Sequence, residues 1–292
     1  MKTLCIVNPT AGKGRALKVW QSVEHSIREL CKPLEVAYTR CKGDATCIAK
    51  MAADEGFQMV VAFGGDGTFH EVINGLAYSE VIFAIVPAGS GNDFARSLGL
   101  SKNPNQAIAA IAAQRVRKID LGKLADQYFL NMGGLGFDAD VASRINRKRI
   151  LRGPLAYLVA VLQTLIVYRS YQLEIVIDEK KFTEDAVLVS VGNGQYIGGG
   201  LRVLPGASLD DGLLDVMVAR KCSRWEILKT LPLIYHGKHV GHPKCDFYKG
   251  CKIEISLVDR TAKANAQVDG EEFCESNLQF LIAPLALQVI VP

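Results

Sequence analysis

The sequence lacks the cysteine patterns that would stabilise a small extracellular fold or hold a structural metal. No CxxC pair occurs, and the cysteines are too scattered to form a dense disulfide framework. A chain of 292 residues has room for its own hydrophobic cores and needs no such framework. The pattern therefore predicts reduced cysteines and a cytoplasmic protein. The eight positions are Cys5, Cys31, Cys41, Cys47, Cys222, Cys245, Cys251 and Cys274.

Long apolar runs, a signal peptide and a strong charge bias are also missing. The most apolar segment, Pro154–Tyr168, falls short of the about 20 residues needed to span a bilayer. The first residues, "MKTLCIVNPTAGKGR", reach glycine and charge too early for a secretory signal. The net charge of +4 is too small to indicate a nucleic-acid partner. Any action at a membrane is therefore expected to take place from its surface.

Two common nucleotide-binding motifs are absent as well. No GxGxxG motif follows a predicted strand, and "NPTAGKGR" lacks the GxxxxGK[ST] spacing of a P-loop. The first absence argues against an ordinary dinucleotide-dependent dehydrogenase. The second leaves open the alternative that Lys13 and Arg15 are a solvated pair.

The apolar pattern that is present predicts two domains. The first third of the chain alternates short β-branched runs with segments of helical spacing, which predicts a parallel sheet covered on both faces. The predicted strands are Leu4–Asn8, Leu34–Thr39, Met59–Phe63 and Ile82–Pro87. Beyond Arg117, short strands with tight polar links predict a mainly antiparallel domain, interrupted by helices near Leu155–Tyr168 and Arg224–Tyr235. The last strand, "LQVIVP", fits either domain.

Three glycine-containing turns follow strands of the first domain: "NPTAGKGR" (8–15), "GGDGT" (64–68) and "PAGSGNDFAR" (87–96). In an open parallel sheet these loops share the carboxyl edge, where ligands bind. Thr68 is expected to cap the following helix, whose free N–H groups favour an anion. Asp66 would repel a bare phosphate but suits a metal-bound nucleotide. The alternative is a tight turn in which Asp66 only caps.

Six ordered motifs resemble the diacylglycerol kinase catalytic domain of bacterial lipid kinases, which is related to sphingosine and ceramide kinases. They are "NPTAGKG", "GGDGT" with "HEVINGL", "PAGSGNDFAR", "GNGQYIGGG", "PGASLDDGLLDV" and "VDGEEF", and they extend from Asn8 to Phe273. The resemblance implies the fold of NAD kinase and 6-phosphofructokinase. An α/β ATP-binding domain (1–125) would include a returning strand (284–292), and a mainly antiparallel β-sandwich (126–283) would receive the lipid.

The resemblance also implies a site for ATP and Mg²⁺ in the cleft between the domains. Asp66, Asp93 and Asp120 would surround the catalytic Mg²⁺, and Glu271 would accept the proton of the lipid hydroxyl, with Glu272 left open as a rival. Two solvated acids in a hairpin turn are the alternative reading of "VDGEEF". The residues expected at ATP are Asn8, Pro9, Thr10, Ala11, Gly12, Lys13, Arg15, Thr39, Gly64, Gly65, Asp66, Gly67, Thr68, Phe69, His70, Glu71, Ser90 and Asn92.

In relatives a second, structural Mg²⁺ is held at positions x, x+3 and x+5, partly through backbone carbonyls, and the resemblance implies Ser208, Asp211 and Leu213 as these positions here. An Asp-Gly turn that needs no metal is the alternative.

The resemblance predicts phosphorylation of a primary hydroxyl on a membrane lipid, with diacylglycerol giving phosphatidic acid as the preferred reaction. Another lipid, or a soluble acceptor such as NAD, stays open, as does a binding protein without turnover. A basic cluster of Arg144, Arg147, Lys148, Arg149 and Arg152 is either a solvated helix face or a contact with an anionic membrane surface. The sequence leaves a homodimer open.

Overall fold

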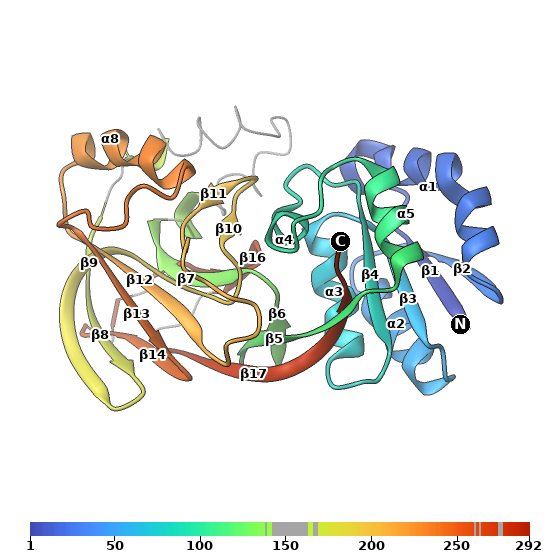
Figure 1. Ribbon diagram of the computed structural model, residues 1–292. Coiled ribbons are helices and arrows are strands. Elements are labelled where there is room, and N and C mark those ends of the chain that lie inside the picture. The colour runs from blue at the N-terminus through green and yellow to red at the C-terminus, as the bar shows by residue number, and fades with distance from the viewer. Residues whose placement is uncertain (138, 142–162, 166–168, 260, 263, 274–276) are drawn as a thin grey trace. The chain divides into compact units, whose positions relative to one another are not determined.

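A computed structural model describes residues 1–137, 139–141, 163–165, 169–259, 261–262, 264–273 and 277–292. The chain forms two compact units (Figure 1). The first contains Met1–Leu121 and Ala283–Pro292, and the second contains Gly122–Ile282. The basic cluster at 144–152 and most of the helix predicted near Leu155–Tyr168 lie outside the described residues.

The first unit is built on a parallel sheet. Its strands lie in the order β17-β4-β3-β1-β2, and every neighbouring pair is parallel. Val7 at the end of β1 pairs with Phe63 and with Tyr38, so these strands end at the same level. The bounds are β1 (Thr3–Val7), β2 (Leu34–Tyr38), β3 (Met59–Gly64), β4 (Ile82–Pro87) and β17 (Asn277–Ile290).

Helices cover both faces of this sheet. Trp20 of α1 packs edge-on against Phe63 of β3, with ring centroids 5.0 Å apart. Phe69 of α3 packs in the same manner against Phe83 of β4, at 6.3 Å. Phe83 pairs with Val60, an odd number of residues from Phe63, so the two phenylalanines point to opposite faces. The helices are α1 (Ala11–Leu30), α2 (Asp44–Asp54), α3 (Asp66–Leu76), α4 (Asp93–Ser97) and α5 (Pro104–Ala113).

The second unit is a mainly antiparallel β structure. Its main sheet has the order β16-β15-β7-β9-β8-β14-β17, and β12 pairs with both β9 and β13. The bounds are β6 (Gln127–Phe129), β7 (Met132–Gly136), β8 (Tyr171–Ile177), β9 (Lys180–Gly192), β10 (Tyr196–Ile197), β11 (Leu201–Arg202), β12 (Leu214–Arg220), α8 (Arg224–Tyr235), β13 (Cys245–Gly250), β14 (Lys252–Leu257), β15 (Ala266–Val268) and β16 (Glu271–Phe273). β5 (Val116–Leu124) leads into this unit from the first.

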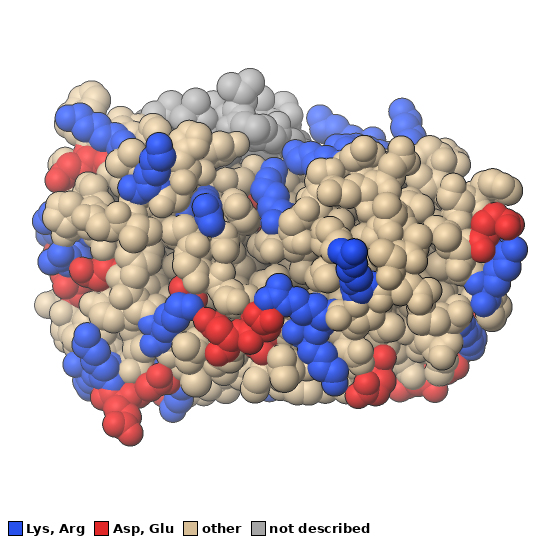
Figure 2. Space-filling model, viewed as in Figure 1, with Lys and Arg blue, Asp and Glu red and all other residues tan. Residues whose placement is uncertain are grey.

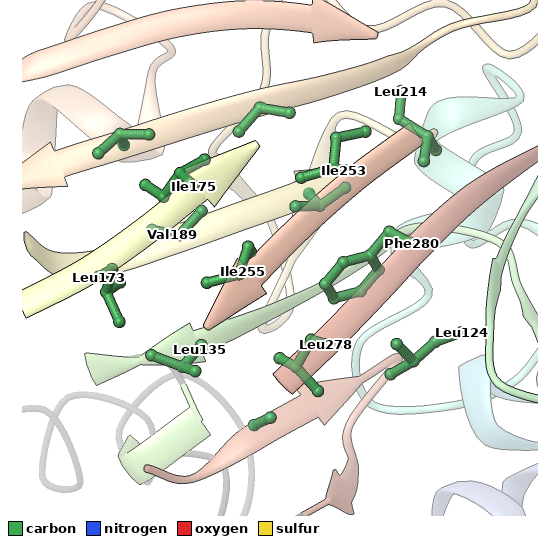
Figure 3. Packing of buried hydrophobic residues seen from close by; sticks show 14 of the residues in the cluster. Leu124, Leu135, Leu173, Ile175, Val189, Leu214, Ile253, Ile255, Leu278 and Phe280 are labelled. Carbon is green, nitrogen blue, oxygen red and sulfur yellow. The ribbon is translucent and has the colours of Figure 1, made fainter. Parts of the chain in front are cut away.

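The core of the second unit consists of aliphatic side chains from alternate strand positions. Leu173 and Ile175 of β8 lie near Ile253 and Ile255 of β14, and Phe280 of β17 belongs to the same buried cluster (Figure 3). Phe280 also packs edge-on against Phe129, at 6.0 Å between ring centroids. This packing holds the antiparallel strands on which the candidate residues of this unit stand.

The structure confirms the predicted fold class. The first four strands are parallel, the later ones are antiparallel, and α8 has the predicted bounds. The open assignment of "LQVIVP" is resolved, because Gln288 and Val289 of β17 pair in parallel with Ile82 and Phe83 of β4. The predicted cap at Thr68 is wrong: α3 already begins at Asp66, with Gly65 at the N-cap position, because the chain turns helical directly after β3.

Candidate active site

The loop after β1 is bonded to the loop after β3 through Asn8. The Asn8 backbone N–H donates to the Phe63 carbonyl at 3.0 Å, and its Nδ2 donates to Thr68 Oγ1 at 2.9 Å. Its Oδ1 accepts both the N–H and the hydroxyl of Thr10, at 3.1 and 3.0 Å. Thr68 therefore acts as an acceptor for a neighbouring loop, and two of the three predicted loops are fixed together by a single side chain.

Glycines allow these loops to approach at backbone distance. A Cβ on Gly12 would collide with the Ala88 carbonyl oxygen, and Gly12 has a φ of +59°. A Cβ on Gly65 would lie 2.8 Å from the Cα of Gly89. Larger residues would separate the loops that follow β1, β3 and β4, so the glycines are required by close packing as well as by conformation.

Asp66 connects the β3 loop to the β4 loop. Its Oδ2 accepts the Asn92 backbone N–H at 2.6 Å, and its Oδ1 accepts the Phe94 N–H at 3.1 Å. Asp66 thus caps α4, a different helix from the one that it begins.

Asp93 lies beside Asp66 and forms an ion pair. Its Oδ1 is 2.7 Å from Arg96 Nη1, which also donates to the Gly91 carbonyl at 2.7 Å. A Cβ on Gly91 would lie 2.7 Å from Asp66 Oδ2 and 3.4 Å from Asp93 Oδ2, so both oxygens border the same small region. Carboxylate oxygens are ligands that Mg²⁺ takes in proteins, and a metal at this pair stays a prediction. Arg96 was not among the predicted site residues, although its i,i+3 spacing from Asp93 was a usable signal.

Asn92 and Ser90 define the rest of the β4 loop. Asn92 is buried in a left-handed conformation, with a φ of 58°. Its Oδ1 accepts the Gly89 N–H at 2.9 Å, and its Nδ2 donates to the Gly89 carbonyl at 3.0 Å. Its amide therefore shapes the loop from within, whereas Ser90 is exposed at the tip, where a hydroxyl can meet a ligand.

Other predicted nucleotide residues have different surroundings. Thr39 is buried and its N–H donates to the Val7 carbonyl at 3.0 Å. Phe69 and His70 are buried on α3, and Glu71 accepts the Ala45 N–H at 3.2 Å, which directs its carboxylate toward the start of α2. Lys13, Arg15 and Gly67 are exposed. Pro9 lies in the turn after β1, Ala11 is the first residue of α1, and Gly64 is the last residue of β3. Their contact with ATP stays a prediction.

Asp120 forms its hydrogen bond with a different segment from Asp66 and Asp93, namely the returning strand β17. It is 1% exposed on β5, and its Oδ1 accepts the Leu285 N–H at 2.7 Å. It holds the returning part of β17, and its place at a metal stays a prediction.

In the second unit, the "VDGEEF" motif forms the β15–β16 hairpin. Asp269 and Gly270 are the two turn residues, with φ values of 47° and 89°. The Asp269 carboxylate accepts the N–H groups of Leu130, Asn131 and Met132, at 2.8, 3.0 and 3.2 Å. This residue, which was not among the predicted site residues, therefore fixes the hairpin to the start of β7.

Glu271 and Glu272 follow this turn on β16. Because successive strand side chains point to opposite faces, the two carboxylates have different surroundings. Glu271 is half-buried and Glu272 is exposed. Which of the two carboxylates accepts the proton stays a prediction.

The predicted structural Mg²⁺ ligands lie in the loop before β12. The Ser208 hydroxyl donates to Asp210 Oδ1 at 3.0 Å, and the Leu213 N–H donates to Asp211 Oδ1 at 3.2 Å. The second Asp211 oxygen is 2.7 Å from the ammonium of Lys249. No group of three or more His, Cys, Asp or Glu side chains with metal-binding geometry occurs among the described residues. The cation that the structure places beside Asp211 is the Lys249 ammonium, and the Mg²⁺ site stays a prediction.

Two families match the two parts of the chain. Residues 2–124 match the diacylglycerol kinase catalytic domain, and residues 132–291 match the YegS C-terminal NAD kinase beta sandwich-like domain. The diacylglycerol kinase of Mycobacterium tuberculosis is 31% identical over 100% of this chain and 95% of its own length. That of Bacillus subtilis (strain 168) is also 31% identical, over 91% of this chain and 88% of its own.

Solved structures agree with these matches. A putative diacylglycerol kinase from Bacillus anthracis str. Sterne superposes with a TM-score of 0.81 at 28% identity, covering 100% of this chain and 97% of that one. The fold and the glycine-rich loops thus define a lipid kinase. The chain belongs to the diacylglycerol kinase catalytic-domain family.

Proposed function

We propose that this lipid kinase transfers the γ-phosphoryl group of ATP, with Mg²⁺, to the primary hydroxyl of diacylglycerol. The observation that carries the proposal is the convergence of three loops at one sheet edge, with Asp66 and Asp93 facing the same region beside Gly91. Two relatives of this chain bear the name diacylglycerol kinase, which supports the acceptor.

The residues of the first unit would bind and orient the nucleotide. Phosphoryl transfer depends on positioning and on neutralising charge at the phosphate oxygens. Asp66 and Asp93 would hold Mg²⁺, which neutralises that charge when bound. Backbone N–H groups at the start of α3 would face the phosphates, and the exposed hydroxyl of Ser90 would add a hydrogen bond.

Glu271 would receive the proton of the acceptor hydroxyl. The hydroxyl oxygen forms a bond to the γ-phosphorus while the bond from that phosphorus to the bridging oxygen breaks, and ADP leaves. A carboxylate is in general a far weaker base than an alkoxide. The proton therefore moves late, when the new bond has made the alcohol acidic.

The direct test is transfer from radiolabelled ATP to lipids in mixed micelles. We expect labelled phosphatidic acid from diacylglycerol, at a rate above those for phosphatidylglycerol, sphingosine and ceramide. Labelled NADP from NAD would instead identify a soluble acceptor. The proposal fails if no acceptor is labelled.

We also propose that the enzyme reaches its substrate by docking at the surface of an anionic membrane. No helix among the described residues has the length and apolar character needed to span a bilayer. Trp225 and Tyr235 of α8 are 74% and 54% exposed, and Lys229 and Lys238 are exposed nearby in the sequence. Tryptophan and tyrosine favour the membrane interface, and each basic residue near an anionic surface adds about 1 kcal/mol.

On the face in Figure 2, Lys and Arg side chains of the described residues lie beside Asp and Glu along the lower part, whereas the Lys and Arg side chains of the upper half have few acidic neighbours. A homodimer stays a prediction, which analytical ultracentrifugation would test.

A further inference from the structure

Strand pairing places a lysine inside the acidic loop before β12. Asp215 is the second residue of β12 and lies directly opposite Lys249 of β13 in the antiparallel register. Directly opposed residues place their Cβ atoms about 4.5–5.5 Å apart on the same face. The neighbourhood of these two side chains is therefore set by the backbone.

The ammonium of Lys249 is surrounded by oxygen atoms of this loop. Its Nζ lies 2.7 Å from Asp211 Oδ2 and 3.1 Å from Asp215 Oδ2. Lys249 Nζ donates hydrogen bonds to Asp211 Oδ2 and, at 3.4 Å, to the Gly206 carbonyl, whereas its contact with Asp215 is an ion pair. The Asp215 side chain is only 10% exposed, so its charge needs a nearby partner.

Both oxygens of the one carboxylate among the expected ligands are already engaged. Asp211 Oδ1 accepts the Leu213 N–H at 3.2 Å, and Asp211 Oδ2 lies 2.7 Å from the Lys249 ammonium. A divalent ion beside Asp211 would also lie close to the ammonium, and the two positive charges would repel each other.

We propose that Lys249 is the resident cation of this loop and takes the place of the structural Mg²⁺ expected from the family pattern. The loop 206–215 then folds without a divalent ion. The inference does not depend on the proposed lipid acceptor. It implies that any Mg²⁺ requirement of the enzyme belongs to the nucleotide site.

The test compares thermal unfolding of the full chain, without nucleotide, in EDTA and in excess Mg²⁺. The wild type is expected to keep its Tm within about 1 °C, because its cation is covalently attached. Lys249→Met is expected to lose about 3 °C or more in EDTA, and to recover part of this loss in Mg²⁺. Lys249→Arg, which keeps the positive charge, should need no Mg²⁺.

Lys252→Met is the matched control. Lys252 forms a surface ion pair with Glu254 at 2.7 Å, so its loss should change the Tm little and give no response to Mg²⁺. In a double variant, Lys249→Met with Asp211→Asn should recover stability relative to Lys249→Met alone, because the uncompensated charge is removed.

Equilibrium dialysis with Mn²⁺ shows whether the loop before β12 binds a divalent ion in the wild type, and it does not require Lys249→Met to fold. The proposal is supported if the wild type and Asp211→Asn bind the same amount of Mn²⁺. One tightly held ion per chain that Asp211→Asn abolishes would overturn it. The proposal would also be overturned if the Tm of the wild type fell in EDTA and recovered with Mg²⁺ while the Tm of Asp211→Asn did not respond to either.

Discussion

Asp66 Oδ2 accepts the backbone N–H of Asn92 at 2.6 Å, and this bond joins the loop after β3 to the loop after β4. The same carboxylate faces the region that Asp93 borders. One side chain thus has two tasks: its hydrogen bonds set the loop geometry, and its charge would hold a cation for the reaction.

Asp66→Asn should separate these two tasks. The amide oxygen can still accept one backbone N–H, so we expect a loss of about 1–2 kcal/mol in the free energy of unfolding. Loss of the charge should lower kcat by about 100-fold or more. Denaturant unfolding and labelled ATP transfer measure the two effects. Asp54→Asn, at the end of α2, is the control, and equal activity of both variants would contradict the assigned role.

Gly67→Ala tests whether ATP contacts the start of α3. Gly67 lies in the helix, and nothing comes within 4 Å of the position that a Cβ would take, so alanine should leave stability equal or raise it by about 0.5–1 kcal/mol. If phosphates approach this backbone, the new methyl group should raise the KM for ATP about tenfold or more. Gly65→Ala, which meets Gly89, should instead lower both stability and activity. Unchanged ATP kinetics in Gly67→Ala would remove α3 from the nucleotide site.

Glu271→Gln and Glu272→Gln form a matched pair on neighbouring positions of β16. Glutamine in place of Glu271 would keep the shape of the side chain but could not accept a proton, so we expect kcat to fall about 100-fold to 10,000-fold. The exposed partner should tolerate the change, with kcat within about threefold of the wild type. Circular dichroism checks that both variants fold. The opposite ranking would transfer the role to Glu272.

The sequence predicted the fold because its signals were local. Strand and helix periodicity, together with glycine turns after three strands, were sufficient for the parallel sheet and for the loops at its edge. The helix predicted near Arg224–Tyr235 is present as α8, and the structure adds that Ser223 and Glu226 form a capping box at its start.

What the sequence did not predict arises between distant segments. Asp66 caps α4, which begins only at Asp93, and Asp269 anchors its hairpin to the chain at Leu130, 139 residues earlier. The pairing of Lys249 with Asp215 depends on strand register. Spacing along the chain carries no signal for such contacts, so tertiary structure was needed to find them.

His239 should make stability depend on pH. It is 0% exposed, and its Nε2 lies 2.9 Å from the Val203 carbonyl, an arrangement that suits a neutral ring donating from Nε2. Burial, the largest influence, lowers the pKa of His239, although the bond to Val203 acts in the opposite direction. A lowered folded-state pKa means that the unfolded chain binds the proton more tightly. The contribution to stability is therefore complete above the unfolded value of about 6.5 and is lost as the pH falls below it.

His239→Gln can keep the hydrogen bond to Val203 but cannot titrate in this range. We expect its Tm to change less than that of the wild type between about pH 7.5 and about pH 5.5. His236→Gln, at an exposed position, should follow the wild type. Parallel pH profiles for the wild type and His239→Gln would show that another group controls the transition.

Trp225→Ala tests the proposed membrane contact. A tryptophan that is 74% exposed contributes little to the folded core, so stability should stay within about 0.5 kcal/mol. Insertion of the ring at the interface is worth about 1.5 kcal/mol, so binding to vesicles of anionic lipid should weaken about tenfold in a sedimentation assay.

The control is Tyr78→Ala, which removes an exposed aromatic residue of the first unit and should leave vesicle binding as in the wild type. Added salt should weaken wild-type binding, because exposed Lys229 and Lys238 attract the anionic surface. If Trp225→Ala and Tyr78→Ala bind alike, α8 is not the docking surface.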